Sequence, residues 1–330
     1  MAVAVVQPLP GIGDMIWHLP HIRAIAAHVG EPVTLIAKPR SAADQIFSAE
    51  QTIHDVLWLD RNPEQRHGEH DGGAGLLRVV MALRARRFDA VYILHHSTTI
   101  ALMTMLAGIP ARYGYGYGIQ GWFLNRPPRL PRAILKQHPF DQATAWLTTA
   151  GIQMAEAEPI LPVTPSAIET VRSRLGPKET WTAIGIGSSE PYKQWGAARF
   201  AALADALASR RDGRLILVGG IAEATLAAEI MSLAHTNAIT TAIAWNLSEI
   251  AALFRLSKFY IGNDTGVMNI AAAVGIRTYG LFGAVPPFHH SSRIVAITPP
   301  GGVSKSGGMA GLSVEHVLAE IEADQASTRS

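Results

Sequence analysis

The sequence predicts an α/β fold made of two doubly wound parallel-sheet domains. Short apolar runs such as Val3–Val6 and Val33–Ala37 alternate with helix-like segments. This alternation is typical of parallel sheets whose strands are buried on both faces. It stops at a segment with three prolines, 156–165, and then starts again. The chain has 330 residues, enough for two domains of ordinary size.

We therefore expect four parts: an N-terminal domain over 1–155, a linker over 156–165, a second domain over 166–312, and a C-terminal helix and tail over 313–330. The prolines favour an extended linker, because proline and the residue before it both avoid helical backbone. Ser313 is expected to cap the last helix. Two such domains commonly hold a ligand in the cleft between them.

In the first half, each expected strand is a short apolar run, and Gly108 and Gly151 follow the last two helices, as glycine often does. The strands are expected at 3–6, 33–37, 55–59 and 90–94, and the helices at 14–29, 42–47, 76–86, 100–107 and 140–150. In the second half, the strands are expected at 181–185, 215–219, 259–262 and 279–282, and the helices at 168–175, 197–208, 223–234, 248–256, 267–274 and 313–323.

Composition excludes several classes of protein. Hydrophobic residues make up 48% and charged residues 16%, so disorder is not expected. A formal net charge of +2 without a long Lys/Arg run argues against a dedicated nucleic-acid binder. The absence of cysteine excludes disulfides and thiolate metal sites. With no signal peptide and no apolar run long enough to span a bilayer, we expect a cytoplasmic protein, with peripheral contact at the inner membrane left open.

A candidate ligand site lies in the stretch from Phe259 to Gly283. An apolar run ends in Asp264-Thr265-Gly266, and a helix of small residues follows. In an open α/β sheet this position borders the ligand crevice, and free amides at a helix start favour a phosphate. The alternative is an ordinary turn in which Asp264 or Thr265 only caps the helix.

The loop after the first predicted strand, Gly11–Asp14, is a second candidate. Gly11 and Gly13 allow a tight turn and a close approach of a ligand to the backbone. Asp14 at the helix start is a candidate general base. Its alternative role is an N-cap, and His18, one turn later on the same helix face, is expected to pack or to orient a neighbour.

A third loop, Gly185–Trp195, offers Ser188, Ser189 and Lys193 ahead of a helix. Hydroxyls and an ammonium group suit a diphosphate that leaves with extra negative charge. The spacing is not that of a Walker motif, and no GxGxxG opens a helix here, so a nicotinamide dinucleotide is disfavoured.

The fourth loop is Gly219–Glu223. Its two glycines leave room beside the strand end, and Glu223 could accept hydrogen bonds from a ribose. The alternative is an acid that only interacts favourably with the helix dipole.

Histidine pairs such as His95 and His96 do not have the spacing of a metal site. We therefore expect no metal. With a nicotinamide dinucleotide disfavoured, we also expect no cofactor.

The acceptor side of a reaction is less marked. A basic bias in the first half suits an anionic acceptor or a membrane surface, or it is a solvated face. The residues are Arg78, Arg84, Arg86, Arg87, Arg112, Arg126, Arg129, Arg132 and Lys136. Aromatic residues between Tyr113 and Phe123 are interleaved with glycine and either stack on sugars, touch a membrane or pack internally.

Three motifs together resemble one known family, the bacterial ADP-heptose:lipopolysaccharide heptosyltransferases of glycosyltransferase family 9. The segment from Gly11-Ile12-Gly13-Asp14 to Leu19-Pro20 is similar to the family's N-terminal signature. Gly187-Ser188-Ser189 through Lys193-Gln194-Trp195 is similar to a second one. Gly262-Asn263-Asp264-Thr265-Gly266, followed by Leu281-Phe282-Gly283, is similar to a third.

The resemblance implies a GT-B fold, with the acceptor on the N-terminal domain, a nucleotide-diphospho-sugar on the C-terminal domain, and inverting transfer without a metal. By motif, Asp14 would be the base, and Lys193 would act on the leaving diphosphate. Donor contacts would come from Gly13, Ser188, Ser189, Lys193, Glu223, Asp264, Thr265, Gly266 and Asn269. The acceptor would be a lipopolysaccharide core or another surface glycan.

Two positions depart from the family pattern, because Val267 and Asn269 stand where the family usually has Pro and His. Asparagine can donate and accept hydrogen bonds but carries no charge. A different nucleotide-sugar donor is therefore an alternative. A nucleotide-sugar epimerase and a non-catalytic nucleotide-sugar-binding protein are two others.

Overall fold

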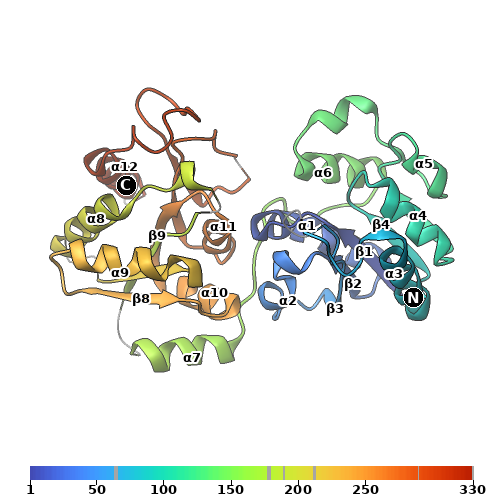
Figure 1. The fold of residues 1–330 in the computed structure, drawn as a ribbon, viewed down its shortest axis with the longest axis horizontal. Helices are drawn as coiled ribbons and strands as arrows, with labels where there is room; N and C mark the ends of the chain where they lie inside the picture. Colours follow the sequence, from blue (N-terminus) through green and yellow to red (C-terminus); the bar gives the residue numbers. More distant parts are fainter. Residues whose placement is uncertain (63–65, 177–179, 189, 211–212, 289, 329–330) are drawn as a thin grey trace. The chain divides into compact units, whose positions relative to one another are not determined.

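The computed structural model describes residues 1–62, 66–176, 180–188, 190–210, 213–288 and 290–328. The chain divides into two compact units, Met1–Ile160 and Leu161–Ser330 (Figure 1). The division falls inside the proline-containing segment 156–165. Each unit is an α/β layer built on one parallel sheet, which confirms the predicted fold class.

The first unit has a five-stranded parallel sheet in the order β3-β2-β1-β4-β5. Its strands are β1 Val3–Gln7, β2 Val33–Ala37, β3 Ile53–Trp58, β4 Ala90–Ile93 and β5 Ala111–Gly114. Its α-helices are α1 Ile12–Val29, α2 Ala43–Ile46, α3 Gly72–Arg86, α4 Thr98–Leu106, α5 Gln120–Phe123 and α6 Pro139–Thr149, with short 3-10 helices η1 Pro39–Ser41 and η3 Arg132–Lys136.

The second unit has a six-stranded parallel sheet in the order β11-β10-β9-β6-β7-β8. Its strands are β6 Trp181–Gly185, β7 Arg214–Gly219, β8 Ile239–Ile243, β9 Ser257–Asn263, β10 Arg277–Leu281 and β11 Ile294–Ile297. Its α-helices are α7 Pro165–Leu175, α8 Ala197–Ser209, α9 Ala224–Leu233, α10 Leu247–Arg255, α11 Gly266–Ala273 and α12 Val314–Ser327, with 3-10 helices η4 Pro191–Lys193 and η5 Ile221–Glu223.

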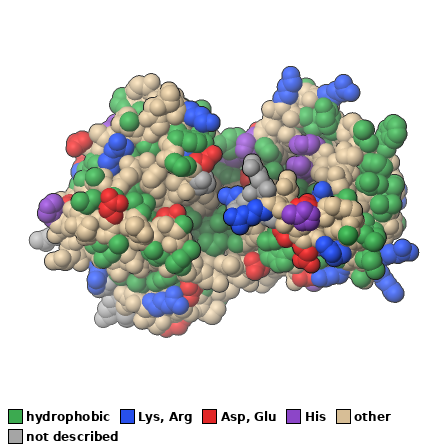
Figure 2. Space-filling model, in the orientation of Figure 1, with side chains coloured by type: hydrophobic (Ala, Val, Ile, Leu, Met, Phe, Trp, Pro, Cys, Tyr) green, Lys and Arg blue, Asp and Glu red, His purple; other side chains and the backbone are tan. Residues whose placement is uncertain are grey.

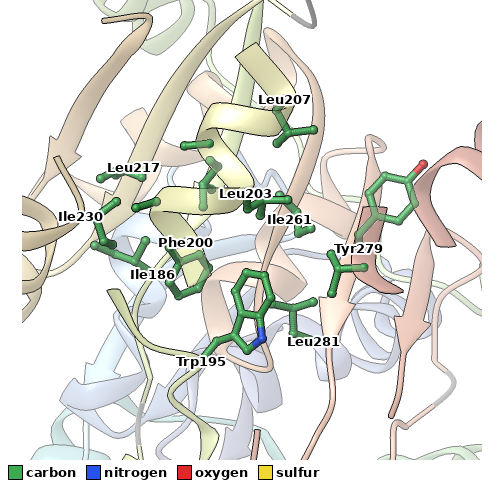
Figure 3. Close-up of a cluster of buried hydrophobic side chains, with 14 of the residues drawn as sticks. Ile186, Trp195, Phe200, Leu203, Leu207, Leu217, Ile230, Ile261, Tyr279 and Leu281 are labelled. Atoms are coloured by element: carbon green, nitrogen blue, oxygen red, sulfur yellow. The ribbon is translucent and has the colours of Figure 1, made fainter. Parts of the chain in front are cut away.

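Each sheet is buried on both faces, which is why its strands are apolar throughout. Ala4 and Val6 of β1 pack into a cluster with Val79 and Leu83 of α3, and the intervening Val5 is equally buried on the other face. In the second unit, a larger cluster joins α8 to the sheet (Figure 3). No described helix combines the length and the hydropathy that a bilayer crossing requires.

Three strands have no counterpart among the predicted elements: β5, β8 and β11. They are the two outer strands of the second sheet and one edge strand of the first. Their residues are mostly half-buried, so they lack the continuous apolar run that marks a central strand. The predicted cap of the last helix is confirmed, since the Ser313 side chain accepts a hydrogen bond from His316 N.

Close packing between β6 and β9 gives a prediction for stability. A Cβ atom on Gly185 would lie 1.8 Å from Tyr260 Oη, and Tyr260 is fully buried. Gly185→Ala is therefore expected to lower the free energy of unfolding by about 1–3 kcal/mol through overpacking. Gly187→Ala is the matched control, because its Cβ would meet only the Glu223 carboxylate, at 3.7 Å or more. Urea unfolding of both variants measures the difference, and equal midpoints would contradict the prediction.

Candidate functional site

Each sheet changes its winding direction between two neighbouring strands, β1 and β4 in the first unit and β6 and β9 in the second. Loops leaving the carboxyl ends of such strand pairs border the ligand crevice of doubly wound folds. Asp14 follows β1 and His95 follows β4, while Lys193 follows β6 and Asp264 follows β9. Each unit thus gathers predicted site residues at its own switch point.

Asp14 lies in the first turn of α1, together with Gly13, and the helix N-cap is Gly11. The interpretation of Asp14 as the N-cap is therefore wrong. Its carboxylate rests against Gly11, where a Cβ atom would be 2.6 Å from Asp14 Oδ2. Burial raises the pKa of Asp14 above its ordinary value, and the nearby His138 and the Gly11 amide offset only part of that rise. Such a carboxylate holds a proton more tightly than a solvated one, which suits a general base.

His18 is completely buried beneath this turn and holds its backbone. Its Nδ1 lies 2.7 Å from the Asp14 carbonyl oxygen. Gln7 Nε2 lies 3.0 Å from the same nitrogen, at the end of β1. His18 therefore orients a neighbour, as the sequence predicted, and burial lowers its pKa to about 4.

Four further residues at this edge were not predicted as site residues: Lys38 after β2, His95 and His96 after β4, and His138 before α6. The two imidazoles of His95 and His96 stack with ring centroids 4.3 Å apart. Burial lowers the pKa of His95 to about 4, with smaller contributions from His96, Lys38 and His18. Lys38, His95 and His96 directly follow predicted strands, which was the available signal, although the histidine pair was considered only as a metal ligand. His138 follows no predicted strand.

The buried His18 predicts a stability loss in acid. An unfolded His18 binds a proton near pH 6.5, while the folded one binds it only near pH 4. The stability that comes from keeping His18 neutral is fully present above pH 6.5. It is lost as the pH falls towards 4, and the loss in the free energy of unfolding is about 3 kcal/mol. The His18→Gln protein lacks this titrating group, so its free energy of unfolding should fall by about 3 kcal/mol less over the same pH range. Chemical denaturation at pH 7, 5.5 and 4.5 tests this, and parallel curves for the two proteins would rule it out.

In the second unit, Lys193 joins the loops that follow β6 and β9. Its Nζ lies 3.1 Å from Asp264 Oδ2 and 3.4 Å from Glu190 Oε2. Burial alone would lower the pKa of Lys193, but these two carboxylates raise it above the ordinary value. The ammonium group therefore stays charged over the whole working pH range, at the place where the helix α11 begins.

The amides at the start of α11 are not capped by the side chain of its N-cap residue. Thr265 is the N-cap and makes no side-chain capping bond, and Gly266 is the first helical residue. Thr265 therefore occupies the N-cap position, as the capping interpretation allowed, but without a capping hydrogen bond from its side chain, and Asp264 precedes the cap. Asn269, one turn on, is buried and donates from Nδ2 to the Thr265 carbonyl over 3.2 Å. Its Oδ1 has no hydrogen-bond partner in the described part of the chain.

Ser188 and Glu223, two predicted donor contacts, already form hydrogen bonds within their own loops. Ser188 Oγ donates to the Glu190 carbonyl over 2.7 Å. Ser189 lies outside the described residues. Glu223 Oε2 accepts from Gly220 N over 2.8 Å, and the same carboxylate lies near Gly187. Glu223 thus supports the start of η5 and also borders the loop that carries Ser188.

Asn263 fixes the spacing between the two loops, although it was predicted only as part of a motif. Its buried Nδ2 lies 3.0 Å from the Gly187 carbonyl, 3.2 Å from the Ile186 carbonyl and 3.2 Å from Gln194 Oε1. An asparagine directly after an apolar strand was the available signal. Trp195, in contrast, is a core residue whose Nε1 donates to the Leu312 carbonyl.

Comparison with known proteins identifies the family. A model of the family described as glycosyltransferase family 9 (heptosyltransferase) matches residues 76–297. The chain belongs to glycosyltransferase family 9. The matched range includes Lys193 and Asp264 and begins after Asp14. Membership makes the protein a glycosyltransferase and confirms the resemblance noted in its motifs. It disfavours the epimerase and the non-catalytic alternatives.

Individual relatives agree with this assignment. The lipopolysaccharide heptosyltransferase 2 of Escherichia coli is 24% identical over 66% of this chain and 67% of its own length. A family 9 glycosyltransferase from Veillonella parvula has the same fold, with a TM-score of 0.80 at 20% identity, over 98% of this chain and 96% of that one. The E. coli heptosyltransferase WaaC, solved with ADP-2-deoxy-2-fluoro heptose, gives 0.75 at 18% identity over 98% and 100%.

Proposed function

We propose that this enzyme transfers heptose from ADP-heptose to a lipopolysaccharide core or another surface glycan, with inversion at the anomeric carbon. The single observation that carries the proposal is the Lys193–Asp264 pair at the uncapped start of α11, in a chain of this family. It fits a site for a sugar diphosphate because a fixed cation and free helix amides both favour phosphate.

The donor half of the reaction then belongs to the second unit. The amides of Thr265 and Gly266 hold a phosphate, and Lys193 balances the charge that develops as the bond from the anomeric carbon to the diphosphate oxygen breaks. Asp264 accepts hydrogen bonds from sugar hydroxyls. Glu223, with one oxygen already bound to Gly220 N, keeps its second oxygen for the ribose. Ser188 lines the diphosphate.

The acceptor half belongs to the first unit. Asp14 takes the proton of the acceptor hydroxyl while the hydroxyl oxygen attacks the anomeric carbon, on the face opposite the leaving diphosphate. The raised pKa of Asp14 supports this role. Lys38 near it suits an acceptor that carries carboxylate or phosphate groups, while His95 and His138, whose pKa values burial lowers, offer uncharged hydrogen bonds. The proposed lipopolysaccharide acceptor is lipid-linked, so peripheral contact with the inner membrane is part of the proposal.

We also propose that transfer needs no metal ion. The reason is that Lys193 and the start of α11 supply positive charge where the leaving diphosphate would lie. Turnover is expected to be unchanged after dialysis against EDTA, measured as release of ADP. A loss that Mg²⁺ or Mn²⁺ restores would contradict the proposal.

Asn269 favours one alternative, a different nucleotide-sugar donor. Its buried Oδ1 lacks a partner in the described chain, one turn into the phosphate-binding helix. A donor hydroxyl directed at that oxygen would satisfy it, whereas the family's histidine offers a different hydrogen-bonding pattern. Asparagine in place of histidine at position 269 would therefore alter the choice of sugar rather than the choice of nucleotide.

A thermal-shift series separates these possibilities. ADP-heptose, ADP, and ADP-, UDP-, GDP- and TDP-linked hexoses are compared at equal concentration, because binding to the folded state raises its stability by RT ln(1 + [L]/Kd). The largest shift is expected with ADP-heptose. A shift with all ADP-sugars alike supports the alternative donor, and none with any ADP compound would sink the ADP assignment.

A further inference from the structure

Three neighbouring helices of the first unit expose large apolar side chains. Leu77 and Met81 lie on α3, Leu106 ends α4, and Ile119 and Trp122 lie at α5. Trp122 is 83% exposed and Met81 64%. Helix α3 contacts α4, and α4 contacts α5. We call these five residues the α3–α5 face.

The inner sides of the same helices are packed, so the exposed residues are not a missing core. Val79, Leu83, Ile100 and Met103 on the inner sides join one buried cluster with the sheet. Figure 2 shows hydrophobic side chains gathered along the edge that α3, α4 and α5 occupy in Figure 1. Contiguous exposed apolar surface of this kind usually marks an interaction site.

The segment that carries this face is mostly basic. From Gly72 to Phe140 the sequence has nine Lys or Arg residues and a single acid, Asp89, although Arg86 is paired with Asp55. Arg84 continues the exposed stripe of Leu77 and Met81 along α3, and Arg126 follows α5. In Figure 2, Lys and Arg side chains lie above and below the hydrophobic edge.

We infer that the α3–α5 face docks on a lipid bilayer with anionic headgroups. Such a surface complements an apolar stripe flanked by arginines, and tryptophan is enriched at the level of headgroups. A second copy of the chain is a poorer occupant. A two-fold contact would bring two like-charged arginine borders together, which repels.

The structure also links this face to the base. The buried Gln120 of α5 donates to the His95 carbonyl over 2.7 Å and accepts from Gly116 N over 2.9 Å. The segment with Ile119 and Trp122 is therefore fixed to the β4 loop that lies beside Asp14 at the switch point. The docking itself is argued from the surface of the protein, and only its benefit rests on the proposed function. That benefit is to bring a lipid-linked acceptor to the edge of the sheet that carries the base.

Vesicle sedimentation tests the inference directly. The wild-type protein is expected to bind vesicles containing 30% phosphatidylglycerol and to be released by about 0.5 M NaCl, which screens the arginines. Trp122→Glu and Met81→Glu should each weaken binding on the order of tenfold. Met231→Glu on α9 is the matched control, since Met231 is also exposed, and should bind as wild type does.

The outcomes remain separable from those of the donor assay. Both variants should keep the thermal shift with the donor and wild-type turnover of a soluble, delipidated acceptor, because their side chains face solvent. Failure of the wild type to bind anionic vesicles, or undiminished binding by Trp122→Glu, overturns the inference and leaves the transfer proposal intact. Self-association without lipid that Trp122→Glu abolishes also overturns it, since the face would then cover a second copy.

Discussion

Replacement of Asp14 by Asn is expected to lower kcat by about 10²- to 10⁴-fold, the usual contribution of a general base. The amide keeps the size of the carboxylate and its position against Gly11, so the turn should remain intact. Donor binding, measured by thermal shift, should change little because all the proposed donor contacts except Gly13 lie on the other unit's loops. The measurement is steady-state release of ADP with a saturating acceptor.

Asp44→Asn is the matched control for this change. Asp44 also lies in the first turn of a helix, α2, and is exposed. In the wild type, kcat/KM should fall on the acid side with a midpoint above the ordinary pKa of aspartate, because only the deprotonated carboxylate is a base and burial raises the pKa of Asp14. Normal turnover by Asp14→Asn would remove the carboxylate from the mechanism.

Replacement of Lys193 by Gln is expected to lower kcat by about 10²- to 10³-fold, since the leaving diphosphate loses its fixed cation. Donor affinity should fall as well, because the ammonium group also attracts the diphosphate before reaction. The pair with Asp264 is partly exposed, with 17% and 25% of the two side chains accessible. Its loss should therefore cost about 1 kcal/mol of stability or less.

Lys258→Gln provides the comparison, because Lys258 is an exposed lysine at the opposite end of β9 from Asp264. Its turnover should equal that of the wild type. A Lys193→Gln enzyme with an unchanged kcat and a raised donor KM would show that the lysine binds the ground state and transition state equally. The catalytic role would then pass to the helix start alone.

The candidate residues that could be predicted were those with a recognisable local sequence pattern, a polar residue between an apolar run and a helix. Asp14 and Asp264 each follow a short apolar run and precede a helix, and Lys193 lies in a polar loop with the same setting. His138 could not be selected in this way. It lies near Asp14 because α6 packs against α1, and contacts between distant segments leave no pattern in one sequence.

Helix caps show a similar limit. The sequence allowed Asp14, Asp264 and Thr265 to be caps, because these residue types are common at that position. The structure gives the N-cap of α1 to Gly11 and that of α11 to Thr265, whose side chain makes no capping hydrogen bond. A shift of one to three residues at a helix start decides whether a carboxylate serves its own helix or faces a ligand.

Two parallel α/β domains were determined by the sequence alone, because apolar runs of strand length between helical patterns have few other solutions. The motif order also pointed to one family of transferases. Only the tertiary structure decided the strand order, and with it the switch points between β1 and β4 and between β6 and β9. Strand order depends on which apolar faces fit together across the sheet, a long-range property that local periodicity does not encode. That order brings Lys193 to within 3.1 Å of Asp264, although the two lie 71 residues apart in the chain.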